Sequence, residues 1–125
     1  FRRTTMKLYR IIPEEDWKES KKEGKVPRCN SDKRAGHVHL NKFEDIKTVA
    51  NKYFEHYENP VVIELNVTLD LEKKLSWEKA NSEKNWEQAH LQIENIEMKN
   101  VERFSFLEHI DGGKFDLGEF ILLEK

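Results

Sequence analysis

The sequence predicts a small α+β domain, because strand-type and helix-type patterns follow one another along a single short chain with no repeat and no linker. A chain of 125 residues is long enough to bury a core without a disulfide or a structural metal. The patterns indicate two main helices and five or six strands. Residues 6–125 are expected to form one domain, and residues 1–5, which precede Met6, are expected to be an appended remnant or a disordered arm.

The first half of the chain is predicted to contain both main helices. Residues 7–12 are apolar and β-prone, and Pro13 with three acids after it marks the start of a helix that carries a tryptophan inward and ends near Gly24. Residues 25–35 are expected to form an exposed basic loop. Asn41, with a glutamate three residues later, resembles a capping box. The apolar positions of the helix that follows are Phe43, Ile46, Val49, Ala50, Tyr53, Phe54 and Tyr57, and they are expected to pack in the core.

The second half of the chain is predicted to consist mainly of strands. Residues 61–67 form the clearest strand pattern, and residues 93–98 form a weaker one. A strand within residues 101–110 is expected to return, through an Asp-Gly-Gly turn at 111–113, as an antiparallel partner at 114–117.

Charge and cysteine content limit the possible classes of function. The net charge is −2, but it divides into +5 over residues 1–34 and −7 over residues 35–125. This division fits a phosphate-bearing ligand near the first third of the chain and argues against a broad nucleic-acid surface. The single cysteine cannot form an internal disulfide, and no apolar run has membrane length. A protein of the cytoplasm that does not enter the membrane is therefore expected.

The segment 36–41 contains the main candidate site. His37 and His39 are two residues apart, so in an extended strand they share one face, while Val38 and Leu40 share the other. The second face suits a core. The face with His37 and His39 suits a ligand, because it lies beside a predicted helix start whose first N–H groups are unpaired.

Several short motifs occur in an order that resembles one known family. They are Leu8-Tyr9-Arg10-Ile11, Trp17, Gly24, Gly36–Asn41, Tyr53-Phe54, Val62–Leu65, Leu75–Glu78, His90-Leu91 and Gly113-Lys114-Phe115. Together they span residues 6–118 and resemble the small bacterial domain-of-unknown-function family nine hundred and fifty-two, which is sometimes labelled glutathione S-transferase-like. No thioredoxin-like βαβ pattern supports that label.

The resemblance selects some positions of the candidate site and not others. His39, Trp77-Glu78 and His90 stand where the family has the same residues. His37 stands in place of a phenylalanine, and Asn41 in place of a serine. The pairing of His37 with His39 is therefore expected to be particular to this chain.

The family is similar in fold to the ADP-ribosyltransferase superfamily, which implies a small split-sheet, ADP-ribosylation-like domain and NAD as a possible cofactor. The His-Val-His-Leu string also resembles a segment of RNA 2′-phosphotransferases. On this analogy, which rests on fold alone, Arg10 would pair with a phosphate, His39 would hydrogen-bond a ribose hydroxyl, and Trp17 or Trp77 would stack on a ring. The Glu-x-Glu pair of arginine-modifying transferases is absent from the sequence.

The predicted site residues fall into two roles. His39 and Glu78 are the catalytic candidates, because a carboxylate fixes the tautomer of a neighbouring histidine and raises its pKa. The candidates for ligand binding are Arg10, His37, Asn41, Trp77 and His90. His37, His39 and His90, with Glu78, could also make a metal site, because an H-x-H pair with a third histidine is an adequate tripod. No spacing specifies such a site, and no metal is predicted.

Two functions remain open from the sequence. The first is a transferase or hydrolase with a cleft for a small phosphate-bearing molecule, such as NAD or ADP-ribose. The second is a non-catalytic module that uses the same fold to bind a ligand or a protein. Neither the enzyme question nor the oligomeric state is decided by the residues alone.

Overall fold

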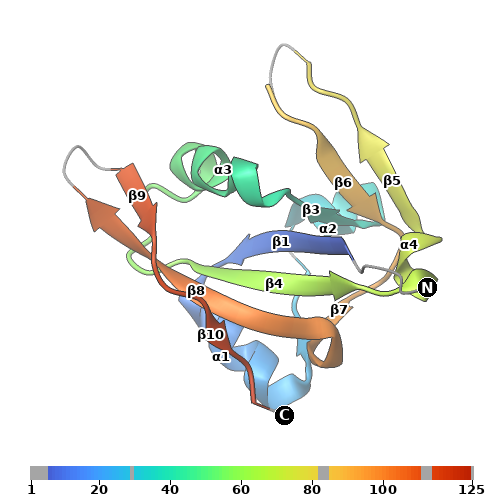
Figure 1. Ribbon diagram of the computed structural model, residues 1–125, viewed down its shortest axis with the longest axis horizontal. Coiled ribbons are helices and arrows are strands. Elements are labelled where there is room, and N and C mark those ends of the chain that lie inside the picture. Colours follow the sequence, from blue (N-terminus) through green and yellow to red (C-terminus); the bar gives the residue numbers. More distant parts are fainter. Residues whose placement is uncertain (1–5, 29, 82–84, 111–113, 125) are drawn as a thin grey trace, which may run out of the picture.

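The computed structural model describes residues 6–28, 30–81, 85–110 and 114–124, and it confirms the α+β class (Figure 1). The helices are α1 (Glu14–Glu23), α2 (Asn30–Ala35), α3 (Ile46–Tyr53) and α4 (Leu69–Glu72), with short 3₁₀ helices at Phe43–Asp45 and Met98–Asn100. The strands are β1 (Met6–Ile12), β2 (Lys25–Val26), β3 (Val38–Leu40), β4 (Val61–Val67), β5 (Leu75–Glu78), β6 (Gln88–Leu91), β7 (Ile96–Glu97), β8 (Val101–Ile110), β9 (Lys114–Leu117) and β10 (Ile121–Leu122). The expectations for residues 1–5 and for the turn at 111–113 lie outside the described residues.

The strands form one main sheet and two smaller ones, all with antiparallel pairs. The main sheet has the order β1-β4-β8-β10, and β9 pairs with the far half of β8. A second sheet has the order β3-β6-β5, and β2 pairs with β7 alone. An isolated bridge between Tyr9 and Asn41 connects β1 of the main sheet to the end of β3. The predicted split of the strands into separate sheets is therefore confirmed.

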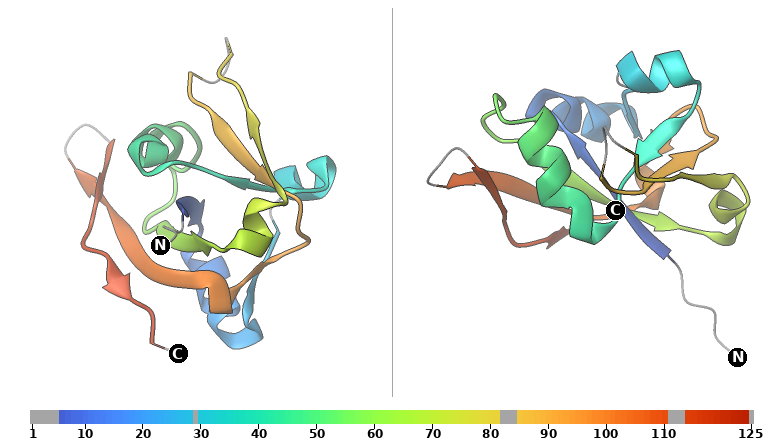
Figure 2. Two further views of the ribbon diagram at one scale, coloured as in Figure 1. Left: turned by 45° about the vertical axis from the view of Figure 1, so that its right-hand side comes forward. Right: turned by 90° about the horizontal axis from the view of Figure 1, so that it is seen from above.

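Alternation along β1 divides the interior into two clusters. Leu8 and Ile12 pack with Trp17 of α1 and with apolar side chains of β3, β4 and β6. Tyr9 and Ile11 pack against α3 and β9. Successive side chains of a strand point to opposite faces, so the two main helices cover opposite sides of the main sheet (Figure 1). The left view of Figure 2 shows the same separation of α1 from α3.

Helix α1 confirms its sequence signals. Pro13 immediately precedes the helix, and its first turn carries three acids, which interact favourably with the positive end of the helix dipole. Gly24 has a φ of 78°, and its N–H donates to the carbonyl of Ser20. A left-handed residue of this kind ends a helix most easily when it is glycine. Trp17 is buried, as predicted.

The capping prediction for Asn41 is wrong. Both its backbone N–H and its backbone C=O pair with Tyr9, at 2.7 and 2.8 Å, and this pairing keeps the residue extended. The helical path begins later, with the 3₁₀ turn at Phe43–Asp45, and α3 begins at Ile46 without a side-chain cap.

The predicted core face of the second helix is only partly correct. Ile46, Val49 and Ala50 are buried, and Phe54 is partly buried. The rings of Phe43, Tyr53 and Tyr57 are 55%, 49% and 44% exposed. The helical pattern predicted one continuous apolar stripe, but α3 is shorter than that stripe: it begins after Phe43 and ends at Tyr53, before Tyr57.

The basic loop expected at residues 25–35 is also wrong. Lys25 and Val26 form β2 against β7, and residues 30–35 form α2. Gly36 follows α2 with a φ of 78°, and its N–H donates to the carbonyl of Asp32 at 2.8 Å. This left-handed turn directs the chain from α2 into β3.

The patterns at 61–67, 101–110 and 114–117 correspond to β4, β8 and β9, as predicted. The weak pattern at 93–98 contains only the two residues of β7. The strands β5, β6 and β10 were not predicted. No helix in the part of the chain that the structure describes is long and apolar enough to cross a membrane.

Candidate functional site

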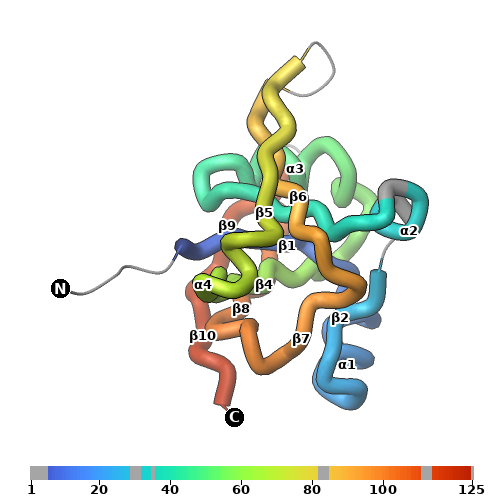
Figure 3. The backbone as a smooth tube through the Cα atoms, turned by 90° about the vertical axis from the view of Figure 1, so that its right-hand side faces the viewer, coloured from blue at the N-terminus to red at the C-terminus, as the bar shows by residue number. Residues whose placement is uncertain are grey.

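One face of the β3-β6-β5 sheet collects most of the predicted site residues. His39 of β3 is opposite His90 of β6, which is opposite Ser76 of β5. One step along the sheet, Gln88 of β6 is opposite Glu78 of β5. Because side chains alternate along a strand, the five side chains just named share one side of this sheet. We call this side, with His39, His90, Ser76, Gln88 and Glu78, the polar face. Figure 1 shows β6 between β3 and β5, and Figure 3 shows the β5–β6 hairpin from another direction.

The opposite side of this sheet is part of the core. Val38, Leu40, Ala89 and Leu91 are at most 2% exposed and belong to one cluster with residues of the main sheet. A slip of one residue in the register of β3 would turn His39 into this cluster. The prediction that Val38 and Leu40 face the core while His39 faces away is therefore confirmed.

Three imidazoles meet at the polar face. The ring centroids of His37 and His90 lie 4.1 Å apart and nearly parallel, those of His37 and His39 lie 4.8 Å apart, and those of His39 and His90 lie 5.0 Å apart. One ring nitrogen from each histidine can be chosen so that all three lie within 4.8 Å of one another. All three side chains are half-buried.

A buried carboxylate from α2 orients one of these rings. Oδ1 of Asp32 lies 2.9 Å from Nδ1 of His39 and accepts the His39 backbone N–H at 3.2 Å. Asp32 is fully buried. Burial by itself raises the pKa of its carboxyl, but the hydrogen bond from His39 and the charge of Arg10 outweigh it and hold that pKa well below its usual range. With Nδ1 directed at Asp32, Nε2 of His39 is on the far side of the ring from the carboxylate.

Arg10 holds this carboxylate from behind. Its Nη1 donates to Oδ1 of Asp32 at 3.2 Å and to the carbonyl of His39 at 2.7 Å, and its Nη2 donates to Oδ2 of Asp32. The Arg10 side chain is only 8% exposed. The sequence predicted a contact between Arg10 and a phosphate, but the structure pairs its guanidinium with Asp32, so Arg10 positions the site from inside the protein.

Glu78 and Asn41 also reach the polar face, with partners other than those expected. Oε2 of Glu78 lies 3.7 Å from Nε2 of His90, so the carboxylate that was predicted to serve His39 is beside His90. Oδ1 of Asn41 accepts a long hydrogen bond of 3.5 Å from the amide of Gln88, and both side chains are about nine-tenths buried. Asn41 therefore forms part of the floor of the polar face.

Trp77 is not brought to the polar face. It is opposite Ala89, one residue out of step with Glu78 and His90, so it points to the other side of the sheet. There it is 39% exposed, and the Lys42 ammonium lies 5.3 Å from its ring centroid. The alternative stacking residue, Trp17, is buried against Phe104. Neither tryptophan can stack on a ligand held by the three histidines.

Sequence reasoning missed Asp32, Ser76 and Gln88. Asp32 is the only acid in the basic segment 25–35 and precedes His39 by seven residues. An isolated acid among Lys and Arg residues is a weak signal, since most such groups are solvated. Its burial depends on Arg10, which comes from a different part of the chain.

A second buried carboxylate lies in the main sheet, away from the polar face. Glu64 of β4 is 1% exposed; it accepts the hydroxyl of Tyr9 at 2.8 Å and is held by two nitrogens of Arg103, one of them at 2.8 Å. Its pKa is lowered, first by the hydrogen bond from Arg103. Burial, followed by the contact with Glu64, raises the pKa of Tyr9 to about 12. Arg103 also lies over the ring of Phe120, 4.9 Å from its centroid.

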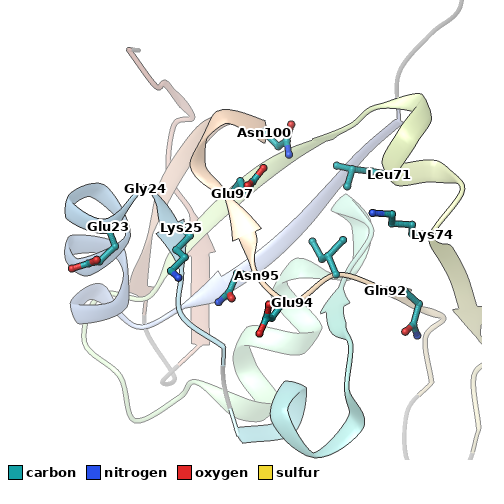
Figure 4. Close-up of a pocket in the computed structure, with 11 residues that line it drawn as sticks. Glu23, Gly24, Lys25, Leu71, Lys74, Gln92, Glu94, Asn95, Glu97 and Asn100 are labelled. Carbon is teal, nitrogen blue, oxygen red and sulfur yellow. The ribbon is translucent and has the colours of Figure 1, made fainter.

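A surface hollow lies elsewhere, between the end of α1, α4 and the segment around β7. Figure 4 shows its polar lining, and its volume is about 680 Å³. Its charged side chains have both signs and are Glu23, Lys25, Lys74, Glu94 and Glu97. None of the predicted site residues lines this hollow. The hollow is therefore separate from the histidine site.

These observations define a class: a small α+β domain with a split sheet that presents a histidine-bearing polar face. The chain belongs to the family described as Protein of unknown function (DUF952), whose profile matches residues 11–104. The family predicted from the motifs is thus confirmed.

Solved structures show the same fold. The crystal structure of protein CC0527 from Caulobacter crescentus covers 89% of this chain and 94% of its own, with 22% identity and a TM-score of 0.75. A double mutant of that protein gives the same values. Its solution NMR structure covers 86% of this chain and 90% of its own, with 23% identity and a TM-score of 0.71. The comparison with curated proteins finds no match.

Proposed function

We propose that the polar face of the β3-β6-β5 sheet binds a small phosphate-bearing molecule of the nucleotide type. The observation that carries the proposal is the convergence of three imidazoles on this face, beside the Asp32 carboxylate that orients one of them. Polar groups that converge above a packed core, and that are held by buried partners, are typical of a binding site rather than of ordinary surface.

Two cationic side chains precede this face in the chain and can attract an anionic ligand. Lys33 and Arg34 are exposed on α2, directly before the turn that leads to His37. Imidazole N–H groups can donate hydrogen bonds to phosphate or ribose oxygens. NAD and ADP-ribose are the ligands that the ADP-ribosyltransferase resemblance suggests, and the split sheet is compatible with that resemblance.

The reaction class that this site suits is transfer or hydrolysis at the bound molecule. Asp32 fixes the orientation of His39, so that ring is presented to a ligand in a single pose. Fixed orientation of a reacting group is a requirement of catalysis. The alternative function is a module that binds the same ligand without converting it. This function requires the polar face to bind the ligand but requires no catalytic residue.

A thermal-shift series would test the proposal. The full chain is heated with millimolar NAD, ADP-ribose, ADP or inorganic phosphate, and we expect at least one nucleotide to raise Tm. A ligand present at ten times its Kd stabilises by about 1.4 kcal/mol, which corresponds to roughly 5 °C in a domain of this size. His39→Ala should lose the shift, whereas His56→Ala, at a side chain that is 91% exposed, should keep it. If no nucleotide moves Tm, the proposal is wrong.

Product analysis distinguishes the enzyme from the binding module. Incubation with the ligand that raises Tm, followed by chromatography of the nucleotide, should show turnover that is lost in His39→Ala. Unchanged ligand after long incubation would leave binding in place and favour the non-catalytic module.

A further inference from the structure

We propose that His37, His39 and His90 bind one divalent transition-metal ion of the zinc class, with Asp32 as the carboxylate that positions His39. This inference goes beyond the proposed function, because binding of the metal requires no nucleotide. The sequence offers these three histidines without a spacing that joins them, and the structure adds the juxtaposition, since β6 places His90 beside the other two.

The three ring nitrogens need only a small movement to surround an ion. They lie within 4.8 Å of one another. Zinc–nitrogen bonds of about 2.0–2.1 Å in a tetrahedral site place the ligand nitrogens roughly 3.3–3.4 Å apart. We expect rotation of the His37 and His90 side chains out of their present stack to provide this contraction, without a change in the pairing of β3 with β6.

The backbone makes the histidine set rigid. His39 and His90 are a cross-strand pair on one face, for which Cβ atoms lie about 4.5–5.5 Å apart. His37 follows Gly36, at the turn out of α2, and so approaches from the end of β3. Two ligands are thus fixed by sheet pairing, and the third lies where the chain has more freedom to adjust.

The surroundings of His39 match those of metal-bound histidines. Such a ligand usually donates its second ring N–H to a carboxylate, which fixes the tautomer and strengthens the ligand. Asp32 occupies this position at 2.9 Å from Nδ1 of His39, and Arg10 holds Asp32 in turn. Nε2 of His39 is therefore the nitrogen available to the ion. Glu78, at 3.7 Å from His90, adds a negative charge beside the cation.

The ligand type selects the class of metal. Three imidazoles suit Zn²⁺, Co²⁺, Ni²⁺ or Cu²⁺, whereas Mg²⁺ and Ca²⁺ prefer oxygen ligands. Three protein ligands leave a fourth position for water or for an oxygen of a bound molecule. That position would lie at the polar face, where the phosphate-bearing ligand is proposed to bind.

Titration of the metal-stripped full chain with Co²⁺ would test the proposal. We expect a visible absorption band of tetrahedral Co²⁺ that saturates at one ion per chain and is displaced by Zn²⁺. Calorimetry should give the same stoichiometry for Zn²⁺, and Mg²⁺ and Ca²⁺ should neither produce nor displace the signal.

Variants then assign the ligands. His90→Gln and His37→Phe should abolish the band, while circular dichroism shows that each variant is folded. His56→Gln should titrate as the wild type does. Asp32→Asn should weaken Zn²⁺ binding by about 10–100-fold, the effect usual for partners of metal-bound histidines. If the wild type gives no band at a stoichiometric excess of Co²⁺, or if His56→Gln removes the band as fully as His90→Gln, the proposal is overturned.

The metal experiment and the nucleotide experiment can fail separately. A Co²⁺ band without any nucleotide shift supports the metal site and rejects the proposed function. If a nucleotide raises the Tm of the metal-stripped protein and Co²⁺ gives no absorption band, the proposed function is supported and the metal site is rejected.

Discussion

Two carboxylates are buried among the residues that the structure describes, Asp32 and Glu64, and they differ in the groups that they bind. Each is at most 1% exposed, and each receives a two-point contact from an arginine. Asp32 is bonded on one side to Arg10, which is buried, and on the other to an imidazole of the polar face. Glu64 is bonded to the Tyr9 hydroxyl and to Arg103, whose side chain is 43% exposed.

The difference separates a structural ion pair from one that positions a site. The Glu64 contacts join β1, β4 and β8 within one sheet, so their effect stays within the main fold. The Asp32 contacts connect β1 to α2 and α2 to β3. Through these two contacts, Arg10 of the main sheet holds Asp32, and Asp32 fixes the orientation of His39. Burial and charge pairing alone therefore do not identify a functional carboxylate. A functional carboxylate is identified by a hydrogen-bonded partner, here His39, that lies on an accessible face of the protein.

The largest expected effect is on stability when each carboxylate is removed. Asp32→Ala strands Arg10 in the interior, and we expect a loss of about 3–5 kcal/mol in the free energy of unfolding, the usual result of breaking a buried pair. Glu64→Ala should cost less, about 1–3 kcal/mol, because the half-exposed Arg103 can be hydrated. Urea denaturation of both variants measures the difference, and equal losses would contradict the distinction between the two arginines.

The next effect concerns the site alone. Asp32→Asn keeps the volume and some hydrogen bonding but loses the charge, and it should weaken Zn²⁺ binding by about 10–100-fold. Glu64→Gln is the matched control in the main sheet and should leave Zn²⁺ affinity within about twofold of the wild type, since effects at independent sites rarely couple. Calorimetry of both variants tests this. A similar loss in Glu64→Gln would mean that the two carboxylates do not differ in role.

The pH dependence of stability should depend on Glu64, Tyr9 and Arg103, which we call the Glu64 cluster. The lowered pKa of Glu64 adds stability above its unfolded-state value of 4.5, and this contribution is lost as the pH falls through the folded-state pKa. The raised pKa of Tyr9 adds stability below 10.0, which is lost as the pH rises from 10.0 to about 12. Glu64→Gln should reduce the decline in stability at both extremes. A pH profile parallel to that of the wild type would contradict the assignment.

The smallest effect is expected at the edge of the Glu64 cluster. Tyr9→Phe removes one hydrogen bond to Glu64 but keeps the ring contacts with Phe43 and Phe120, at 5.5 and 5.9 Å between centroids. A loss of about 1 kcal/mol in urea denaturation is expected, together with unchanged Co²⁺ titration. A change in the Co²⁺ band would show that the two regions are coupled through β1.

Long segments with a clear period could be predicted from the sequence. The strands at β1, β4, β8 and β9 and the helix α1 have such patterns and local end signals, and all five were predicted. The strands β2 and β10 were not predicted, because a strand of two residues forms only when a distant partner offers its backbone. The strands β5 and β6 were also missed, and the two residues of β7 were predicted only as part of the weaker pattern at 93–98. The helix α2 was missed because its residues are mostly polar.

Some residues of the candidate site could also be predicted from the sequence, and others could not. His37 and His39 were recognisable, since alternation with Val38 and Leu40 gives a histidine side and a core side. Trp77 and Glu78 were treated as one motif, yet neighbours in a strand face opposite ways, and only the register with β6 shows which of them joins His90.

The sequence by itself determined the class of fold, the family and the face on which His39 lies, because these depend on local patterns and motif order. Only the tertiary structure decided that His90 completes a three-histidine cluster and that Asp32 supports it. Both contacts join segments that are brought together by strand pairing and by a buried ion pair. Their energies depend on register and on exclusion of water, which no local run of residues specifies.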